Sequence, residues 1–364
     1  MSYKIPIYRP WVTDQDKKFV KDAIESGWIS SIGKYIDLFE DEFCKFIGSK
    51  YSVSTNNGTS ACHLALLSNG IGYGDEVIVP SSTFIACPNS VRYCGAEVVL
   101  ADVDLLTWNI SLESIKEKTT NRTKAVFLVH MLGNPCCEEI YDWCDDKGII
   151  CIEDACESIG ASLNNKKTGS LGKCAAFSFF GNKNLTTGEG GMITTNDVNV
   201  FERAKYLRGQ AQDSTYIHGD IGFNYRMTNI QAAIGYSQML RIEEIICEKS
   251  RVFETYRKNL KSIVGQNNFK FQKTTKNSQH ANWMFAVYSE TTSNIKQDLH
   301  NEGIDTRPMF YPVNSMKPYK SNEIFKNAED LSKNVFMLPS YPELQDKDIV
   351  KICNIVKKSN AKNV

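Results

Sequence analysis

Hydrophobic and polar positions alternate in a regular order between about residues 50 and 195. Short runs rich in β-branched and aromatic residues are separated by segments with helical spacing, which begin near Ser60 and near Glu138. The short runs are apolar at nearly every position, which is typical of strands buried on both faces of a parallel sheet. This order predicts an α/β domain with a mostly parallel sheet covered by helices. The expected strands are Glu76–Pro80, Ala96–Asp104, Lys124–His130, Ile149–Asp154, Ala175–Phe180 and Gly191–Thr195.

The pattern changes in the last third of the chain. A helical pattern runs without an internal proline from Thr228 to Ile263, and we expect it to bridge to a second domain. Beyond it we expect a strand at Trp283–Ser289, a helix around Ile295–Glu302 and a proline-containing loop at Thr306–Tyr319. The sequence thus predicts a large domain at residues 1–245 and a smaller C-terminal α/β domain at residues 246–364.

Composition narrows the possible partners. Of 364 residues, 42% are hydrophobic, and Lys+Arg and Asp+Glu both number 42, so no net field favours nucleic acid or an anionic membrane. The N-terminus lacks a secretory signal and no window is apolar enough to span a membrane, so we expect a cytoplasmic protein. The twelve cysteines are scattered and form no C-x-x-C pair, which favours free thiols over a disulfide framework or a metal site.

Two polar residues stand where buried strands are expected to end. Asp154 closes one strand, at the edge of the sheet where α/β proteins bind ligands, although an Asp here could also cap a following helix. Lys183 follows the next long strand, and an amine held away from water there is a usable nucleophile toward an aldehyde. Pyridoxal phosphate suits both, since it forms a Schiff base with lysine and needs a carboxylate at its pyridine nitrogen. The alternative is a surface lysine in a glycine-rich loop.

A possible phosphate site lies where another strand gives way to a helix. Gly58, Thr59 and Ser60 offer N–H groups and hydroxyls at a helix N-terminus, although Thr59 or Ser60 could merely cap the helix. Ser178 could add a hydroxyl from the strand before Lys183. Phe84 could lie on a pyridine ring, or it could belong to the core.

Several motifs together carry a family resemblance. NNGTSACHLAL, IEDACESIGA, FSFFGNKNLTTGEGGMITTND, GFNYRMTNIQAAIG and GIDTRPMFYPV resemble the DegT/DnrJ/EryC1/StrS sugar aminotransferases over almost the whole chain. The resemblance implies the pyridoxal-phosphate-dependent transferase fold type I, like that of aspartate aminotransferase, with a large mixed, mostly parallel sheet domain and a smaller C-terminal α/β domain. It also implies a homodimer with shared active sites. SGWISS and TRPMFYP are most similar to the perosamine synthases, followed by viosamine-type 4-aminotransferases.

The resemblance also implies roles for individual residues. Lys183 matches the Schiff-base lysine and Asp154 the partner of the pyridinium nitrogen. Glu157 matches a residue near the phenolic oxygen, and Phe84 the residue stacked on the ring. The remaining cofactor positions contact the phosphate; they are Gly58, Thr59, Ser60 and Ser178, with Asn224 reaching it from the neighbouring subunit. The expected sugar-nucleotide contacts are Trp28, Ser30, Arg307, Tyr311 and Asn314.

Three departures from the family pattern lie toward the expected sugar nucleotide. Asn314 stands where perosamine synthases usually have His, Leu132 replaces a common Tyr, and a Trp often found before GFNYRMTN is missing. The resemblance implies transfer of the amino group of L-glutamate to C4 of a nucleoside-diphospho-4-keto-6-deoxyhexose, for polysaccharide biosynthesis. A viosamine-type product, a sugar dehydratase, which would carry His in place of Lys183, and a non-catalytic cofactor-binding protein are the alternatives.

Overall fold

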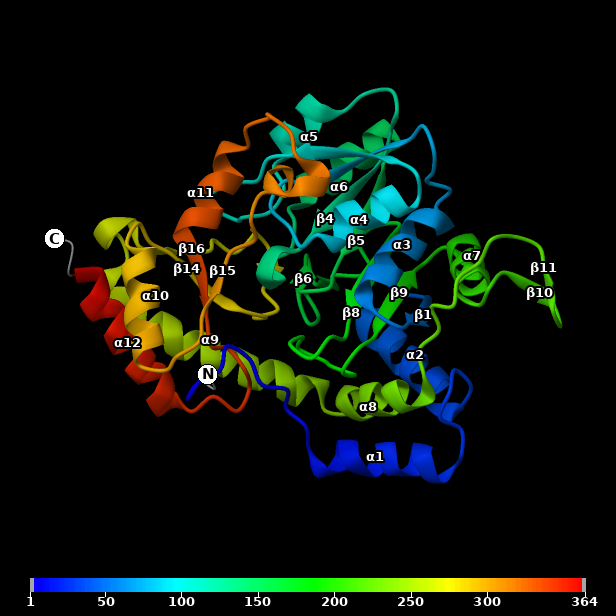
Figure 1. Cartoon of the computed structure of the whole chain (residues 1–364), viewed down its shortest axis with the longest axis horizontal. Coiled ribbons are helices and arrows are strands. Elements are labelled where there is room, and N and C mark those ends of the chain that lie inside the picture. Colours follow the sequence, from blue (N-terminus) through cyan, green and yellow to red (C-terminus); the bar gives the residue numbers. More distant parts are fainter. Residues whose placement is uncertain (1–2, 362–364) are drawn as a thin grey trace.

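The computed structural model describes residues 3–361 and contains a central seven-stranded sheet with the order β1-β9-β8-β5-β4-β2-β3 (Figure 1). The pairs from β8 through β5, β4 and β2 to β3 are parallel, whereas β9 pairs antiparallel with both β8 and β1. The mixed, mostly parallel α/β sheet expected from the sequence is thereby confirmed. Its strands are β1 (Tyr51–Thr55), β2 (Glu76–Pro80), β3 (Glu97–Ala101), β4 (Thr123–Val129), β5 (Ile150–Asp154), β8 (Cys174–Ser178) and β9 (Gly191–Thr195).

Helices cover both faces of this sheet because alternate residues of each strand point to opposite sides. In β4, Phe127 and Val129 join the core under one set of helices, whereas Val126 and Leu128 join a second core on the other face. Under β8 and β9, that other face is filled by a third cluster around Phe177. The first face carries α3 (Gly58–Ser68), α4 (Ala86–Tyr93) and α7 (Val198–Arg208), and the other carries α6 (Glu138–Lys147), α5 (Leu112–Lys118), α2 (Lys34–Ile47) and α8 (Asn229–Met239).

A second, smaller sheet belongs to the C-terminal part. Its strands lie in the order β12-β14-β16-β15, all pairs are antiparallel, and its core includes Phe285, Phe336 and Tyr256. Ile5 packs into the same core and pairs with Ile304, so the N-terminal segment runs along this unit. The elements are α9 (Ile242–Leu260), β12 (Lys270–Phe271), β14 (Phe285–Tyr288), α10 (Thr292–Asn301), β15 (Arg307–Pro308), α11 (Lys326–Asn334), β16 (Val335–Leu338) and α12 (Asp346–Ala361). The expected domain boundary after residue 245 falls within α9.

The long helix expected over Thr228–Ile263 is wrong in one respect, since it breaks into α8 and α9. The break lies at Leu240 and Arg241, where Arg241 leaves helical geometry with ψ of 22°. The Arg241 guanidinium donates to Trp11 O and, at 3.2 Å, to Asp16 Oδ2. These partners come from the N-terminal segment, so a distant contact redirects the chain at a point where no glycine or proline marks a bend.

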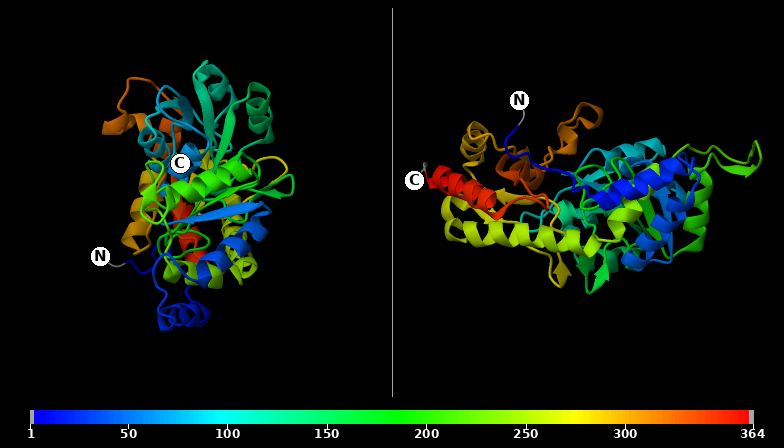
Figure 2. Two further views of the ribbon diagram at one scale, coloured as in Figure 1. Left: turned by 90° about the vertical axis from the view of Figure 1, so that its right-hand side faces the viewer. Right: turned by 90° about the horizontal axis from the view of Figure 1, so that it is seen from below.

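A two-stranded hairpin, β10 (Gln212–Ser214) and β11 (Ile217–His218), extends from the body at the end opposite α12 (Figures 1 and 2). Its tip residue Tyr216 is 91% exposed and Ile221, at its base, 82%. No helix among residues 3–361 has both the length and the apolar content to cross a membrane. The other elements are α1 (Asp14–Glu25), β6 (Ser162–Leu163), β7 (Lys166–Lys167), β13 (Ser278–Gln279) and short 3-10 helices at Met131–Gly133, Lys261–Ile263, Gln266–Asn268, Val313–Ser315 and Lys317–Tyr319.

Candidate active site

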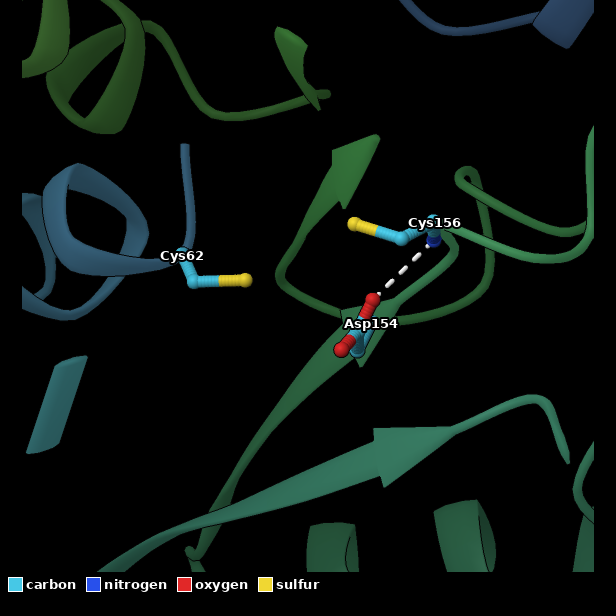
Figure 3. A group of neighbouring side chains, drawn as sticks. All are labelled: Cys62, Asp154 and Cys156. Atoms are coloured by element: carbon cyan, nitrogen blue, oxygen red, sulfur yellow. Dashed lines mark hydrogen bonds between the residues drawn. The ribbon is translucent and has the colours of Figure 1, made fainter. Parts of the chain in front are cut away.

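Asp154 is the last residue of β5, in the middle of the large sheet. It pairs with Val129 of β4 and Ala176 of β8, and it is 6% exposed. Its Oδ1 accepts a hydrogen bond from the backbone N–H of Cys156 at 3.0 Å (Figure 3). Residues 155–160 form turns, so the alternative that Asp154 caps a following helix is wrong. The carboxylate lies at the carboxyl edge of parallel strands, where ligands bind in this class of fold.

Lys183 is held in place through its backbone. Its N–H donates to Phe180 O at 2.9 Å, which closes a turn just after β8. The Tyr8 hydroxyl donates to the carbonyl of Lys183 at 2.6 Å, and the Trp283 indole N–H donates to the carbonyl of Asn182 at 2.7 Å. The Lys183 ammonium lies 4.0 Å from the centre of the Trp283 ring. Lys183 is therefore a partly buried lysine on a clamped turn, and the alternative of an ordinary surface lysine is wrong.

A second lysine fixes the position of Trp283, which contacts Lys183. Lys249, on α9, is fully buried and donates from Nζ to Trp283 O at 2.6 Å and also to Ser340 O. Burial lowers the pKa of Lys249 to about 7. The contact fixes the Trp283 backbone between α9 and the residues after β16, so the C-terminal unit contributes to the position of Lys183.

Glu157 lies within the electrostatic reach of Lys183 and Asp154. It is 6% exposed, and its Oε2 accepts a hydrogen bond from Leu132 N–H at 2.8 Å. Burial raises the pKa of Glu157 to about 7, against the opposing influence of the Lys183 charge and the Leu132 bond. Leu132, one of the departures from the family pattern, is fully buried and has a positive φ of 56°. Its backbone N–H contacts Glu157.

The tip of α3 meets the end of β8. Asn57 caps the helix, because its Oδ1 accepts from Ser60 N–H at 2.9 Å and from the Ser60 hydroxyl at 3.1 Å. The alternative that Thr59 or Ser60 is the cap is therefore wrong. A side chain at Gly58 would place its Cβ 2.7 Å from Ser178 Cβ, too close for any residue but glycine. Gly58, Thr59 and Ser178 thus form a cradle whose N–H and hydroxyl groups suit an anion.

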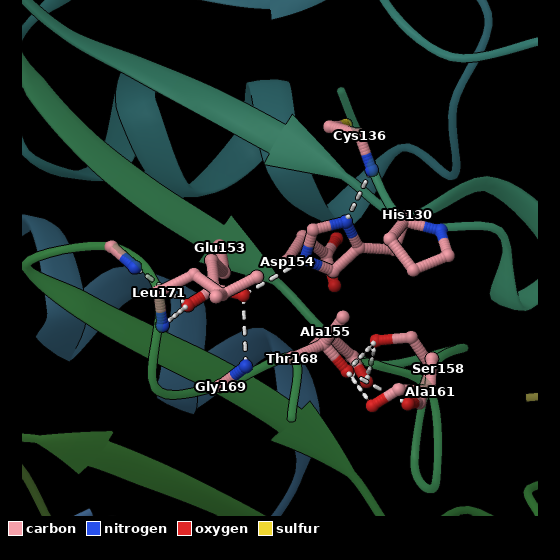
Figure 4. Close-up of polar contacts among 12 residues, drawn as sticks. His130, Cys136, Glu153, Asp154, Ala155, Ser158, Ala161, Thr168, Gly169 and Leu171 are labelled. Atoms are coloured by element: carbon pink, nitrogen blue, oxygen red, sulfur yellow. Dashed lines mark hydrogen bonds and ion pairs between the residues drawn. The ribbon is translucent and has the colours of Figure 1, made fainter. Parts of the chain in front are cut away.

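A buried hydrogen-bond network fixes the strand that carries Asp154 (Figure 4). Glu153, fully buried, accepts from His130 Nε2 at 2.9 Å and from the backbone N–H of Gly169, Leu171 and Gly172 at 2.8 to 2.9 Å. His130 Nδ1 accepts from Cys136 N–H, so its proton lies on Nε2. These bonds satisfy the Glu153 carboxylate and tie two loops to β5.

Part of the expected substrate side lies along the loop before α11. Val313 N–H donates to Ser81 O at 2.8 Å, which holds the loop against the segment that carries Phe84. Phe84 is 58% exposed, with its ring 6.2 Å from that of Phe310. Tyr311 and Arg307 are exposed as well. Asn314 is buried and its Nδ2 donates to Glu323 O at 2.6 Å, so this departure helps to shape the loop.

The remaining predicted residues lie on exposed segments. Trp28 and Ser30 are exposed, and their carbonyls accept hydrogen bonds from buried Asn229 at the start of α8, both at 2.6 Å. Asn224 is exposed near the base of the hairpin. Among residues 3–361, no hydrogen bond or ion pair joins these three to Lys183 or Asp154. The substrate and cofactor roles that the resemblance implies for them stay predictions.

The comparisons with known proteins agree with this geometry. Residues 11–357 match the model of the DegT/DnrJ/EryC1/StrS aminotransferase family. The chain belongs to this family. It is 40% identical to a GDP-perosamine synthase of Escherichia coli O157:H7 over 98% of each chain, and 41% identical to one of Caulobacter vibrioides over 96% of each. A structure of the aminotransferase TlmJ from Streptoalloteichus hindustanus superposes with a TM-score of 0.92, at 25% identity over 98% of this chain and 99% of the other.

Membership confirms the expected fold type and cofactor of this DegT-family aminotransferase. The cofactor is pyridoxal 5′-phosphate, and the residues present fit it: an amine on a clamped turn, a carboxylate at a strand end and an anion cradle lie near one another beyond the ends of β5 and β8. Sequence reasoning missed Tyr8, Asn57, Lys249 and Trp283, all of which act on the site through backbone or packing contacts. Of these four, Asn57 carried a signal in the sequence, because it directly precedes Gly58 in the NNGTSACHLAL motif and Asn is a preferred helix N-cap.

Proposed function

We propose that this aminotransferase moves the amino group of L-glutamate to C4 of GDP-4-keto-6-deoxymannose, forming GDP-perosamine. The observation that carries the proposal is the near full-length identity of about two residues in five to GDP-perosamine synthases, in a chain that keeps Lys183 beside Asp154 and Glu157. The family match supports the reaction class, and these relatives support the sugar and the nucleotide.

The residues of the pocket divide the work. Bound pyridoxal phosphate supplies an electron sink for the carbanion that transamination requires. Asp154 would hold the proton at the pyridine nitrogen, Glu157 would lie near the phenolic oxygen, and Phe84 would pack on the ring. Lys183 would hold the cofactor through its amine and would move the proton as general base and acid, a role worth about 10²- to 10⁴-fold in rate. Gly58, Thr59 and Ser178 would hold the phosphate, and the Ser60 hydroxyl would join them by turning away from Asn57 Oδ1.

The substrate side is supported by placement alone. Tyr311 and Asn314 lie on the loop held against the segment that carries Phe84, and Arg307 lies in β15 just before it. Trp28 and Ser30 lie on a segment anchored to α8. In the proposed complex these residues bind the sugar nucleotide. Asn314, in place of the usual His, changes the hydrogen-bond donors that the loop offers to the sugar nucleotide. A viosamine-type product from dTDP- or UDP-4-keto-6-deoxyglucose is the second candidate.

A homodimer with shared active sites is part of the proposal. The projecting hairpin exposes three apolar residues, Tyr216, Ile217 and Ile221 (Figure 2). Exposed apolar surface of this kind marks a site of protein–protein contact, and in this proposal a second copy of the chain covers it. In that dimer, Asn224 reaches the phosphate of the neighbouring subunit. The enzyme acts in the cytoplasm and supplies an amino sugar for polysaccharide biosynthesis.

One experiment tests the substrate. The purified enzyme is incubated with L-glutamate and, separately, with GDP-4-keto-6-deoxymannose, dTDP-4-keto-6-deoxyglucose or UDP-4-keto-6-deoxyglucose, and each product is identified by mass spectrometry and NMR. We expect GDP-perosamine and little turnover of the other two sugars. Preferred turnover of a glucose-configured sugar would replace the proposal with the viosamine-type function, and no amino sugar from any of the three would contradict both.

A further inference from the structure

Three cysteine thiols converge on the carboxylate of Asp154. Cys87 Sγ donates to Asp154 Oδ2 at 2.7 Å, while Cys156 N–H donates to Oδ1. The Sγ atoms of Cys62 and Cys156 and a carboxylate oxygen of Asp154 all lie within 4.8 Å of one another (Figure 3). The three cysteines come from α3, α4 and the turn after β5, so their separation in the sequence gave no sign of this cluster, and we had expected no metal site.

The donor spacing fits a soft divalent cation. Zn–S bonds of about 2.3 Å place two thiolates of a tetrahedral site about 3.8 Å apart, and a carboxylate is a common further ligand. The neighbouring thiols of Cys156 and Cys87, together with burial, raise the pKa of the Cys62 thiol well above its ordinary value. Three protein donors leave a fourth position open to water or another ligand.

The charges balance as well. Two thiolates and a carboxylate carry three negative charges, of which a divalent cation cancels two. The Lys183 ammonium acts on Cys156 through space and supplies the third positive charge. Both thiols must lose their protons to solvent when they bind the cation, which makes binding stronger as the pH rises.

The geometry points to a soft-metal site formed by Cys62, Asp154 and Cys156 in the cofactor-free enzyme, which excludes pyridoxal phosphate because both need Asp154. The cation is Zn²⁺ or a softer divalent ion. Cys87 holds the Asp154 carboxylate toward the two thiols. The exclusion rests on the cofactor role proposed for Asp154, whereas metal binding itself does not.

Cadmium titration of the apoenzyme tests the site, because thiolate-to-Cd²⁺ charge transfer absorbs in the ultraviolet and reports the thiol ligands directly. We expect one equivalent to bind, with affinity reduced by more than about 10-fold in Cys62→Ser and in Cys156→Ala. Cys247→Ala, at the exposed cysteine of α9, serves as the matched control and should bind like the wild type. Unchanged binding in both site variants, or no band in the wild-type apoenzyme, would overturn the proposal.

The same variants are checked for folding by their capacity to bind pyridoxal phosphate, read from its visible absorbance. Enzyme loaded with the cofactor should show no cadmium band, and cadmium should slow loading of the apoenzyme. A cadmium band of full size in the loaded enzyme would overturn the exclusion. Failure of the proposed aminotransferase reaction would leave the cadmium band unchanged, so the two failures can be told apart.

Discussion

The ammonium of Lys183 lies 4.0 Å from the centre of the Trp283 ring, and the same indole donates its N–H to the carbonyl of Asn182 at 2.7 Å. One aromatic side chain thus contacts both the amine and the backbone of the turn that carries it. Trp283 is itself anchored by buried Lys249, so the C-terminal unit and the large sheet meet at this residue. We interpret the Trp283 ring as the resting place of the free Lys183 amine.

Two substitutions of Trp283 distinguish its contact with the Lys183 ammonium from its hydrogen bond to Asn182. Trp283→Leu removes both, and the loss of a cation–π contact of about 0.5 to 2 kcal/mol predicts a fall in kcat of about 2- to 30-fold with little change in KM. Trp283→Phe keeps an aromatic ring but loses the indole N–H, so its kcat should lie between those of the wild type and Trp283→Leu. Steady-state kinetics measure the effect. Tyr288→Leu removes the ring beneath Lys270, also at 4.0 Å, and should lower stability while leaving kcat unchanged; equal losses in both variants would contradict the interpretation.

Asn57 links helix stability to anion binding. Asn57→Ala removes the cap of α3 and should cost about 1 kcal/mol of unfolding free energy, because Ser60 N–H loses its acceptor. We also expect weaker cofactor binding, since the tip of α3 forms the cradle. Denaturant unfolding and cofactor titration measure the two effects. Ser111→Ala, the equivalent cap of α5, should show the stability loss alone; unaltered cofactor affinity in Asn57→Ala would argue against a cradle at this helix.

Substitution of Gly58 by a larger residue tests whether the phosphate binds at the cradle. The Cβ of Gly58→Ala would lie 2.7 Å from Ser178 Cβ and 3.2 Å from Cys156 Sγ, so Ser178 must move. We expect the Kd for pyridoxal phosphate to rise at least about tenfold, because displaced hydroxyl and N–H donors lose their hydrogen bonds to the phosphate. Gly72→Ala, where the nearest atom is 3.8 Å away, is the control. Normal cofactor affinity in Gly58→Ala would place the phosphate elsewhere.

Glu157 should make the stability of the apoenzyme depend on pH. The pKa of Glu157 is about 7 in the folded protein and 4.5 in the unfolded chain. The contribution of the protonated Glu157 carboxyl to the free energy of unfolding is therefore fully present below pH 4.5 and is lost as the pH rises through 7. The loss is on the order of 3 kcal/mol at about 1.4 kcal/mol per pH unit. Glu157→Gln cannot ionise, so its stability relative to the wild type should increase by a similar amount between pH 4.5 and 7.5.

Urea unfolding across this range measures the difference. Glu189→Gln, at an exposed glutamate in the glycine-rich loop, is the matched control and should follow the wild-type curve. A constant offset between Glu157→Gln and the wild type at all pH values would show that the Glu157 carboxyl does not titrate with a raised pKa.

The sequence predicted the sheet and its polar edge because both depend on local patterns. Each expected strand of the large sheet is present, and Asp154 closes β5 as its place after an apolar run indicated. The break at Leu240 and Arg241 escaped prediction because its cause is Asp16 and Trp11, more than two hundred residues away.

The site was predicted less completely for the same physical reason. Lys183 and Gly58 of the cradle follow from motif and turn chemistry, whereas Trp283 and Lys249 act from another part of the chain. The thiol cluster at Asp154 is formed by residues from three elements, and only their packing reveals it. Contacts that depend on tertiary structure alone leave no periodicity or spacing in the sequence.

Release of 2-oxoglutarate from the loaded enzyme and L-glutamate, without any sugar, tests the central claim most directly. The wild type should release one equivalent per active site in a single turnover, and Lys183→Ala should release none, because no positioned amine moves the proton. Lys173→Ala, at a lysine paired with Asp197 on the surface, should behave as the wild type. Full release by Lys183→Ala, or none by the wild type, would contradict the account.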